Sequence, residues 1–386
     1  MIRKVKFSNF YSFEKEQEIS FLTSKKKSYV YFQSQVRKSE QITKIAGFIG
    51  GNASGKTNIM RLFSFFGYFV CVEGRKNDPD VGFKTFFNNK KISNFFIEFE
   101  IDKDLYLYEF SIKDNLILKE RLLKKNSIKR SKQEEVFCRN HEGIEKLHEN
   151  YFKNFKTDFL KNIRKDVSLI SFLKAHYDIA IVNKIFNYFN IYSNINEHGD
   201  PNTPLHRMLS VDTYLKDRDI KVQVESFMRK FDIGLDGVEI NKEKSDVSIF
   251  GLHRFDKAIH KLPFQYESRG TQSLFFMLVH IFKALKNNSI AIIDEIELGL
   301  HPEAIKKIID YFIDENEKGK AQLIFSSHAL DFLKKFDMQQ IFLTEKKEAG
   351  NSILYRLDSV AGVRTDENFL AKYMTGAYGS FPDIKV

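Results

Sequence analysis

The sequence has few cysteines and no long apolar run, and both shortages limit what the protein can be. Cys71 and Cys138 are the only cysteines among 386 residues, and they lack metal-ligand spacing. This argues against a disulfide framework or a zinc site and fits a reducing compartment. No window approaches the roughly 18 uninterrupted apolar residues of a membrane span, and Met1–Phe7 lacks the apolar centre of a signal peptide. We therefore expect a soluble, cytoplasmic protein without a membrane partner.

The charge balance points towards nucleic acid, but composition offers a second explanation. Lys and Arg number 61 against 51 for Asp and Glu, a formal net charge of +10. The densest basic stretch contains Lys124, Lys125, Lys129, Arg130 and Lys132. A basic surface favours contact with DNA or RNA. The chain is also rich in Lys, Asn, Ile and Phe, as an AT-rich coding sequence would make it, so direct nucleic-acid binding stays open.

One stretch predicts a nucleotide site. Residues 45–49 are apolar, as in a buried strand, and Gly50–Thr57 reads G-x-x-x-x-G-K-T. Glycines let such a loop curl so that its N–H groups point at phosphate, and the following helix adds its positive end. Lys56 would contact the β- and γ-phosphates of ATP, and the Thr57 hydroxyl would hold Mg²⁺. The expected nucleotide-binding residues are Gly50, Gly51, Asn52, Ala53, Ser54, Gly55, Lys56, Thr57 and Asn58.

A second motif places two acidic residues directly after an apolar strand. Residues 290–293 are apolar and lead into Asp294 and Glu295. In phosphate-loop enzymes the first acid after such a strand holds Mg²⁺, so Asp294 joins Thr57 as a metal residue. The second acid can act as a general base towards the attacking water, so Glu295 is assigned to catalysis. An isolated Asp-Glu pair would more commonly cap a helix, and the upstream phosphate loop favours the catalytic interpretation.

Two weaker signals complete the predicted site. Ser268 and Gly270 form a Ser-x-Gly turn before the expected helix 271–286, and such a helix start can bind an anion. His328 follows the expected strand 321–325 and two serines, where it could touch a γ-phosphate or its attacking water. We count His328 as catalytic. Alone, the turn would mean little more than a helix cap, and His328 would more commonly be an ordinary surface or core histidine. The position of the turn shortly before Asp294 and Glu295 favours the phosphate interpretation.

The order of the expected elements predicts an α/β protein. Residues 2–8 and 17–22 are typical of a hairpin, and an antiparallel meander follows at 95–101, 105–112 and 116–122. A short strand at 237–240 brings the chain back to the nucleotide-binding head. The C-terminal part then alternates strands (289–293, 321–325, 340–343) with helices (271–286, 302–316, 329–336). Such alternation implies a parallel sheet sandwiched by helices.

The middle of the chain differs from both ends. Residues 124–234 are charged and carry helical periodicity in 150–164, 166–190 and 204–231. We therefore expect three parts. Residues 1–123 would be the N-terminal part of a nucleotide-binding head, 124–234 an inserted helical lobe, and 235–386 the C-terminal part of the head.

In this order the motifs resemble those of ABC-type ATPase heads, the class shared by transporter motors, SMC proteins and recombination-repair ATPases. Gly50–Thr57 is similar to Walker A, Ser268–Gly270 to the ABC signature, Ile290–Glu295 to Walker B, and His328 to the switch histidine. Leu298–His301 takes the place of the D-loop, although its usual final Asp is His301, and no Q-loop Gln can be assigned. The resemblance implies an ABC-type P-loop ATPase head with an N-terminal antiparallel meander.

A narrower resemblance is to the bacterial AbiLi-type abortive-infection ATPases. It rests on four stretches: Asn9–Phe13, Glu267–Thr271, Asp294–Pro302, and a tail with Arg364–Glu367 and Tyr373–Gly379. It implies a role in anti-phage defence beside a separately encoded effector, often a nuclease of RloB or TOPRIM type. In such heads the signature serine of one subunit completes the site of another, which implies an ATP-sandwiched homodimer with slow ATP hydrolysis.

Two other functions fit less well. The alternative is a DNA-repair or DNA-end-binding SMC-like ATPase that uses the basic lobe directly. A transporter motor ranks third, because the N-terminal hairpin and the inserted lobe suit SMC-like heads better. The chain ends at Val386, soon after the core, so we expect no fused nuclease domain.

Overall fold

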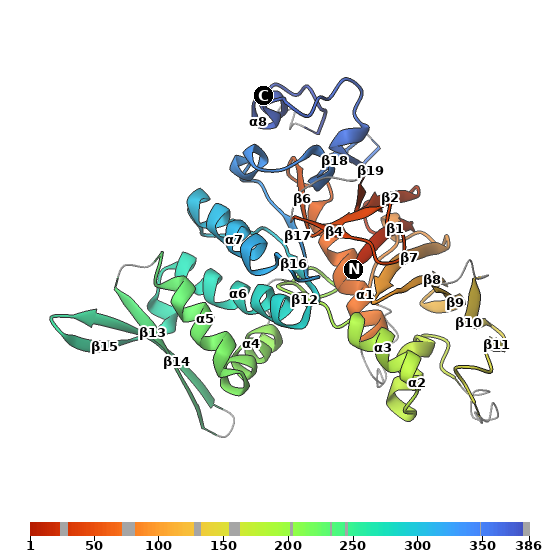
Figure 1. Cartoon of the computed structure of the whole chain (residues 1–386), viewed down its shortest axis with the longest axis horizontal. Coiled ribbons are helices and arrows are strands. Elements are labelled where there is room, and N and C mark those ends of the chain that lie inside the picture. The colour runs from red at the N-terminus through yellow and green to blue at the C-terminus, as the bar shows by residue number, and fades with distance from the viewer. Residues whose placement is uncertain are drawn as a thin grey trace.

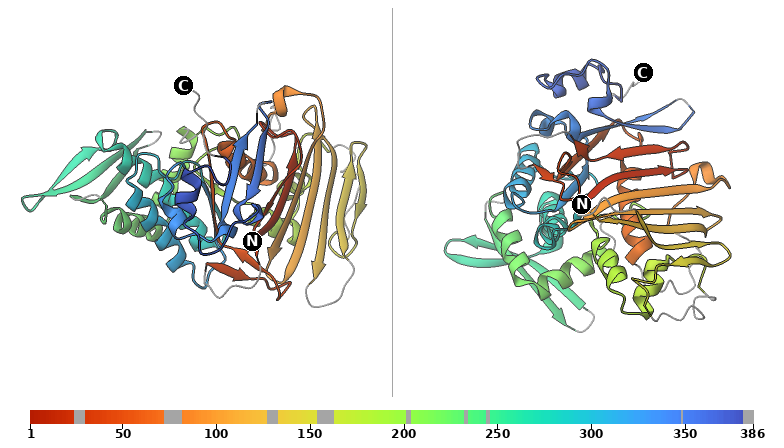
Figure 2. Two further views of the ribbon diagram at one scale, coloured as in Figure 1. Left: turned by 90° about the horizontal axis from the view of Figure 1, so that it is seen from above. Right: turned by 45° about the vertical axis from the view of Figure 1, so that its right-hand side comes forward.

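Two β-sheets meet at the centre of the molecule, and a helical region with a small projecting sheet extends to one side (Figures 1 and 2). The structure is a computed structural model. It describes residues 1–23, 30–71, 82–126, 133–153, 163–200, 204–231, 234–243, 246–347 and 349–380. None of the helices in these ranges is long and apolar enough to cross a lipid bilayer.

The first large sheet is antiparallel, with the order β11-β10-β9-β8-β7-β1-β2. Its strands are β1 (Ile2–Ser8), β2 (Gln17–Ser20), β7 (Ser93–Ile101), β8 (Asp104–Lys113), β9 (Leu116–Asn126), β10 (Glu134–Asn140) and β11 (Ile144–Leu147). The pairings of β1 with β2 and of β7, β8 and β9 confirm the expected hairpin and meander. Because side chains alternate between the two faces of a strand, Phe95, Ile97 and Phe99 all enter the core.

The helical character expected at the start of 124–234 is wrong. β9 continues to Asn126, and β10 and β11 extend the same sheet. Part of the charge in this region is buried rather than solvated: Arg139 Nη2 lies 2.6 Å from Glu120 Oε2, and the Tyr108 hydroxyl donates to Glu120 at 2.7 Å. Because such ion pairs join residues distant in sequence, neither the charge of this segment nor the local spacing of its apolar residues revealed β10 and β11.

The second large sheet carries the sequence motifs. Its order is β12-β16-β17-β6-β18-β19, and every neighbouring pair is parallel except β18 with β19. Its strands are β6 (Ile45–Gly50), β12 (Tyr192–Ser193), β16 (Ile290–Ile293), β17 (Gln322–Ser326), β18 (Ile341–Lys346) and β19 (Ser352–Arg356). Ala46 and Phe48 face one core and Ile45 and Ile49 the other, so both faces of β6 are buried.

Helices cover both faces of this sheet (Figure 1). α1 (Lys56–Cys71) lies in the core shared with the antiparallel sheet, whereas α6 (Arg269–Asn287) and α7 (Pro302–Glu315) lie in the other core. These layers confirm the expected α/β fold class, a parallel sheet sandwiched by helices with an N-terminal antiparallel meander. The helix expected at 329–336 is only a 3-10 turn, η4 (Asp331–Lys334), which turns Phe332 and Leu333 into the core.

The helical region divides between the two cores. It contains α2 (Leu169–His176), α3 (Ala180–Tyr188), α4 (Pro204–Lys216) and α5 (Arg218–Met228), in agreement with the helices expected in 166–190 and 204–231. α2 and α3 pack in the core of α1, whereas α5 packs against α6. α4 also joins α6, because the Tyr214 ring stacks on Phe275 with centroids 4.4 Å apart. Most of the helix expected at 150–164 lies outside the described residues, and the three-part division of the chain stays a prediction.

The strand expected at 237–240 exists, but its expected return to the head is wrong. β13 (Leu235–Glu243), β14 (Asp246–Phe255) and β15 (Ala258–Pro263) form a separate antiparallel sheet that projects away from the head (Figure 1). Asp256 and Lys257 link β14 to β15 with φ of +44° and +69°. Two positive φ values mark a tight hairpin turn between β14 and β15, and β13 pairs with β14 rather than with the parallel sheet.

The other described elements are a small sheet, one short helix and several 3-10 turns. β3 (Leu22–Thr23), β4 (Tyr31–Gln33) and β5 (Gln41–Thr43) form a third antiparallel sheet. The short helix α8 (Phe369–Met374) lies near the described C-terminal end (Figure 1). The described residues also form the 3-10 turns η1 (Phe86–Asn88), η3 (Phe264–Tyr266), η5 (Met338–Gln340) and η6 (Leu357–Ser359).

Candidate functional site

The phosphate loop runs from the end of β6 into the first residues of α1. Gly50 is required by close packing, because a Cβ there would lie 2.3 Å from the carbonyl oxygen of Thr344. Gly55 has a φ of +113°, which side-chain-bearing residues rarely adopt, and its Cβ would lie 2.9 Å from Ser352 Oγ. The first turn of α1 contains no acidic residue. The positive end of the helix is therefore available to an anion.

Lys56 is buried at the base of this loop. Its Nζ donates to the carbonyl oxygens of Gly50 and Gly51, both at 2.9 Å. Burial lowers the pKa of Lys56, and the carboxylates among residues 294–297 oppose that shift. The predicted phosphate-binding lysine and the predicted acids thus lie in one place.

Asp294 follows β16 and is buried. Its carboxylate accepts a hydrogen bond from the Ser326 hydroxyl. Burial raises the pKa of Asp294, and the Ser326 and Thr57 hydroxyls and the charge of Lys56 oppose the shift. Thr57 and Asp294, the two residues predicted to hold a metal, are therefore neighbours.

Glu295 and Asp294 share one support, Ser326 at the end of β17. The Ser326 hydroxyl donates to the Asp294 carboxylate and accepts from the Glu295 backbone N–H at 2.8 Å. Glu295 has a φ of +49°, a conformation that is costly for a residue with a side chain. Such strain persists only where the surroundings impose it, and it gathers at functional sites.

A third acid and the predicted switch histidine lie beside this pair. Glu297 Oε1 accepts from the His328 backbone N–H at 2.5 Å, while Glu297 Oε2 is buried with no hydrogen-bond partner in the described part of the chain. The His328 side chain is exposed. The backbone of His328 is thus tied to the acids, and its ring is left at the surface.

Asn194, which was not predicted, holds the backbone of Asp294. Asn194 Oδ1 accepts from the Asp294 N–H at 2.8 Å, and Asn194 Nδ2 donates to the Asp294 carbonyl oxygen at 2.9 Å. Asn194 follows β12, the edge strand that pairs with β16. Because β12 has only two residues, no periodic pattern marked this loop in the sequence.

The remaining residues of the phosphate loop differ in exposure and in hydrogen-bond partners. Asn52–Ala53 forms an exposed tip. Ser54 Oγ lies 2.7 Å from the hydroxyl of Thr344, and Asn58 Nδ2 donates to Ser12 Oγ at 2.8 Å. Thr344 and Ser12 were also missed, because only the folded chain brings these distant hydroxyls to the loop.

The signature residues form a separate group. Ser268 caps α6, since its Oγ accepts from the Thr271 N–H at 3.0 Å. A Cβ on Gly270 would lie 2.6 Å from the carbonyl oxygen of Gly299, so only glycine fits there without movement. The structure thus brings the signature against the predicted D-loop, Leu298–His301, of the same chain.

Glu267, directly before Ser268, is fixed to the projecting sheet. Its carboxylate lies 2.7 Å from His253 Nε2 on β14. A Cβ on Gly251 of the same strand would lie 1.9 Å from Glu267 Oε1, so glycine leaves the space for this carboxylate. The signature is therefore linked to β14 as well as to α6.

A comparison with family models decides the identity of the chain. The model described as "AAA domain, putative AbiEii toxin, Type IV TA system" matches residues 45–333. The chain belongs to this AAA family. Membership makes it a nucleotide-binding protein of the P-loop ATPase type, and the matched range contains all the residues described above except Ser12, Thr344 and Ser352.

Three solved structures of SMC heads are similar to this AAA chain. The SmcHead bound to the C-winged helix domain of ScpA is 14% identical, with 92% of this chain and 98% of that chain covered and a TM-score of 0.49. The SMC head domain from Thermotoga maritima is 13% identical, with coverage of 92% and 98% and a TM-score of 0.41. The Smc head with an extended coiled coil bound to the C-terminal domain of ScpA, from Pyrococcus furiosus, is 15% identical, with coverage of 92% and 96% and a TM-score of 0.45. No curated protein matches the chain.

The residues present suit a magnesium nucleotide. A threonine hydroxyl and a carboxylate are the oxygen ligands that Mg²⁺ takes from P-loop proteins, the remainder coming from phosphate and water. No cluster of three or more His, Cys, Asp or Glu residues able to hold a metal occurs within the described ranges. Thr57 and Asp294 are thus the residues that would hold Mg²⁺, beside the Lys56 ammonium.

Proposed function

We propose that this AAA chain binds ATP with Mg²⁺ and hydrolyses it slowly. The observation that supports the proposal is the convergence of Lys56, Thr57 and Asp294, which follow two strands far apart in the sequence and lie close enough for Lys56 and Thr57 to oppose the rise in the pKa of Asp294. Lys56 would leave the Gly50 and Gly51 carbonyl oxygens to pair with phosphate. Mg²⁺, when bound, would neutralise phosphate charge.

The acids beyond Asp294 would serve the attacking water. Glu295 would accept its proton as a general base, held at the strand tip by Ser326. His328 would contact the γ-phosphate or that water from the neighbouring strand. The remaining loop residues, from Gly50 to Asn58, would surround the phosphates with backbone N–H groups.

We further propose that two copies enclose ATP between them. The Ser268 side chain bonds only to Thr271 in the described part of the chain. In a homodimer Ser268 and Gly270 of one copy would complete the phosphate loop of the other. A symmetric pair of this kind has two equivalent composite sites.

The biological role we propose is regulation of an anti-phage response in the cytoplasm. It rests on the matched family description, which names type IV toxin–antitoxin systems, and on the narrower AbiLi-type resemblance. ATP binding would set the state of the dimer, and a separately encoded, nuclease-like effector would convert that state into an outcome.

The test is co-purification of the chain with the product of the neighbouring gene, with and without ATP. The parent and the Glu295→Gln variant should both capture this product, in amounts that depend on ATP. Lys56→Ala should lose the ATP dependence. If all three proteins capture the same amount of this product with and without ATP, the proposed regulation by nucleotide is wrong.

The same purified protein can be used to test the alternative function in DNA repair. Of the basic stretch, Lys129, Arg130 and Lys132 lie outside the described residues, and Lys124 pairs with Asp104 at 3.1 Å. If the chain captures no neighbour and binds bare DNA with an affinity that falls steeply with salt, the repair function replaces the defence function.

A further inference from the structure

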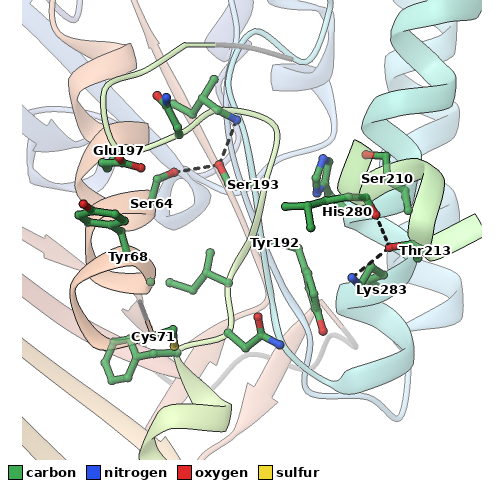
Figure 3. Close-up of a pocket in the computed structure, with 18 of the residues that line it drawn as sticks. Ser64, Tyr68, Cys71, Tyr192, Ser193, Glu197, Ser210, Thr213, His280 and Lys283 are labelled. Carbon is green, nitrogen blue, oxygen red and sulfur yellow. Dashed lines mark hydrogen bonds between the residues drawn. The ribbon is translucent and has the colours of Figure 1, made fainter. Parts of the chain in front are cut away.

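A cavity of about 500 Å³ lies apart from the phosphate loop, between α1, the loop from Phe189 to Glu197, α4 and α6 (Figure 3). Its walls belong to the elements that carry the predicted ATP site. α1 begins at Lys56, and α6 begins directly after Ser268. The loop between them contains Asn194, which holds Asp294. No function discussed so far uses this cavity.

One wall carries a half-buried cation without an opposing carboxylate. Lys283 Nζ lies 3.3 Å from Thr213 Oγ1 and 4.7 Å from the centroid of the Tyr192 ring. The described residues form no ion pair with Lys283, and burial lowers its pKa, with only Asp217 acting to raise it. Since a buried cation is stabilised by an anion, this position favours an anionic ligand.

One of the two acids of the lining is paired with a cation. Asp212 Oδ1 pairs with Lys242 at 2.7 Å, whereas Glu197 Oε1 lies 3.5 Å from His198 Nε2, an ion pair only when that ring is protonated. A second lysine of the lining, Lys216, is exposed and forms no ion pair in the described ranges. The lining therefore offers two cationic groups to a ligand, and one of its carboxylates already has a lysine partner.

Several other lining residues are apolar or aromatic, beside serines, asparagines and His280. Tyr68, Phe189, Ile191, Tyr192 and Val279 all line the cavity. In Figure 3 Tyr68 and Tyr192 lie on opposite sides, with Lys283 next to Tyr192. Aromatic walls with a few placed polar groups, in a volume of this size, are typical of small-molecule sites. Flat rings pack well against such walls.

We propose that this cavity binds a small organic anion that carries a flat ring, of the class of nucleoside monophosphates. Lys283, assisted by Lys216, holds the phosphate group, and the ring lies between the aromatic walls. The Thr213 hydroxyl, which already accepts from Lys283, orients the ammonium group. This site is distinct from the ATP site and does not depend on the proposed function.

The test measures AMP binding by isothermal titration calorimetry to the full chain carrying Lys56→Ala, so that the phosphate loop contributes little. In this background Lys283→Ala should weaken AMP binding about 10-fold or more, since it removes a charged hydrogen-bond donor. Lys283→Arg should restore most of the affinity. Adenosine, which lacks the anion, should bind at least as weakly as AMP binds to the Lys283→Ala protein.

Lys286→Ala is the matched control. Lys286 lies one turn further along α6, is exposed, and pairs with Asp217 at 2.7 Å outside the cavity lining. Its loss should leave AMP binding unchanged. The proposal is overturned if AMP does not bind, if Lys283→Ala binds AMP as the background does, if Lys286→Ala loses as much affinity, or if adenosine binds as well as AMP.

Discussion

The two halves of the predicted ATP site are built in different ways. In the phosphate-loop half, Lys56, Asp294 and Glu295 are fixed by hydrogen bonds between neighbouring strand ends of one buried sheet. In the signature half, Ser268 only caps its own helix, and the preceding Glu267 is fixed to a sheet that projects from the molecule. Within one chain the first half is thus fixed by contacts between strands, and in the proposed homodimer the second half would serve the other copy. The predictions below test this difference.

The largest effect should follow from removing the general base of the phosphate-loop half. Glu295→Gln should retain ATP binding and lose about 10²- to 10⁴-fold in hydrolysis rate, because the amide cannot accept the proton of water. Single-turnover ATPase assays and a binding titration measure the two effects separately.

Glu297→Gln is the matched control, since Glu297 lies beside the same lysine. It should reduce the rate much less than Glu295→Gln. Turnover of Glu295→Gln near that of the parent would remove Glu295 from the mechanism, and a larger loss in Glu297→Gln would transfer the role to Glu297.

Mixing two inactive variants tests whether the halves come from different copies. Ser268→Arg spoils the signature half, and Lys56→Ala spoils the phosphate-loop half. A heterodimer of the two has one site damaged twice and one site intact, so mixing should restore part of the ATPase activity. If demonstrated heterodimers show no recovery, the sites are either obligately coupled or not composite.

A smaller effect should follow from disturbing the anchor of the signature half. In Gly251→Ala the new methyl group would overlap Glu267 Oε1, so the carboxylate must leave His253. Overpacking of this kind costs about 1–3 kcal/mol of stability. We expect a lower melting temperature and reduced ATPase activity with unchanged ATP binding.

Ser248→Ala is the control for this substitution, because Ser248 is exposed on the same strand. It should leave both the melting temperature and the activity unchanged. Normal activity in Gly251→Ala would show that β14 does not position the signature.

The smallest effect should follow from Asn194→Ala, which removes two hydrogen bonds from the backbone of Asp294. Each bond contributes about 0.5–1.5 kcal/mol. We expect a modest loss in hydrolysis rate and a weaker dependence on Mg²⁺, measured by titrating the metal. Asn241→Ala, at an exposed position of β13, should change neither. An unaltered Mg²⁺ dependence in Asn194→Ala would show that the two hydrogen bonds from Asn194 do not position Asp294.

The sequence predicted the parts of the site whose chemistry is local. Lys56 and Thr57 follow glycines in one short loop, and Asp294 ends one apolar strand, so residue type and spacing identify them. Ser326 and Asn194 support these residues from other strands, and neither carries a local signal. They became visible only when the strand order was known.

The same limit applies to the fold. Strands with clean alternation, such as Phe95–Ile101, were predicted, whereas β10 was not, because its Arg139 pairs with the distant Glu120 inside the protein. β14 and β15 were missed for another reason. Their side chains are largely exposed, so no buried face produced an apolar pattern.

The order of the parallel sheet has a consequence for how the chain folds during synthesis. The phosphate-loop strand β6 ends at Gly50, but its two neighbours, β17 and β18, begin only at Gln322 and Ile341. At about 5–20 residues per second, the ribosome needs on the order of tens of seconds to produce them. During that time β6 has both edges unpaired, and the apolar residues Ile45–Ile49 have no sheet to join. Because contacts so distant in sequence also form slowly, the nucleotide site is among the last parts of this protein to be completed.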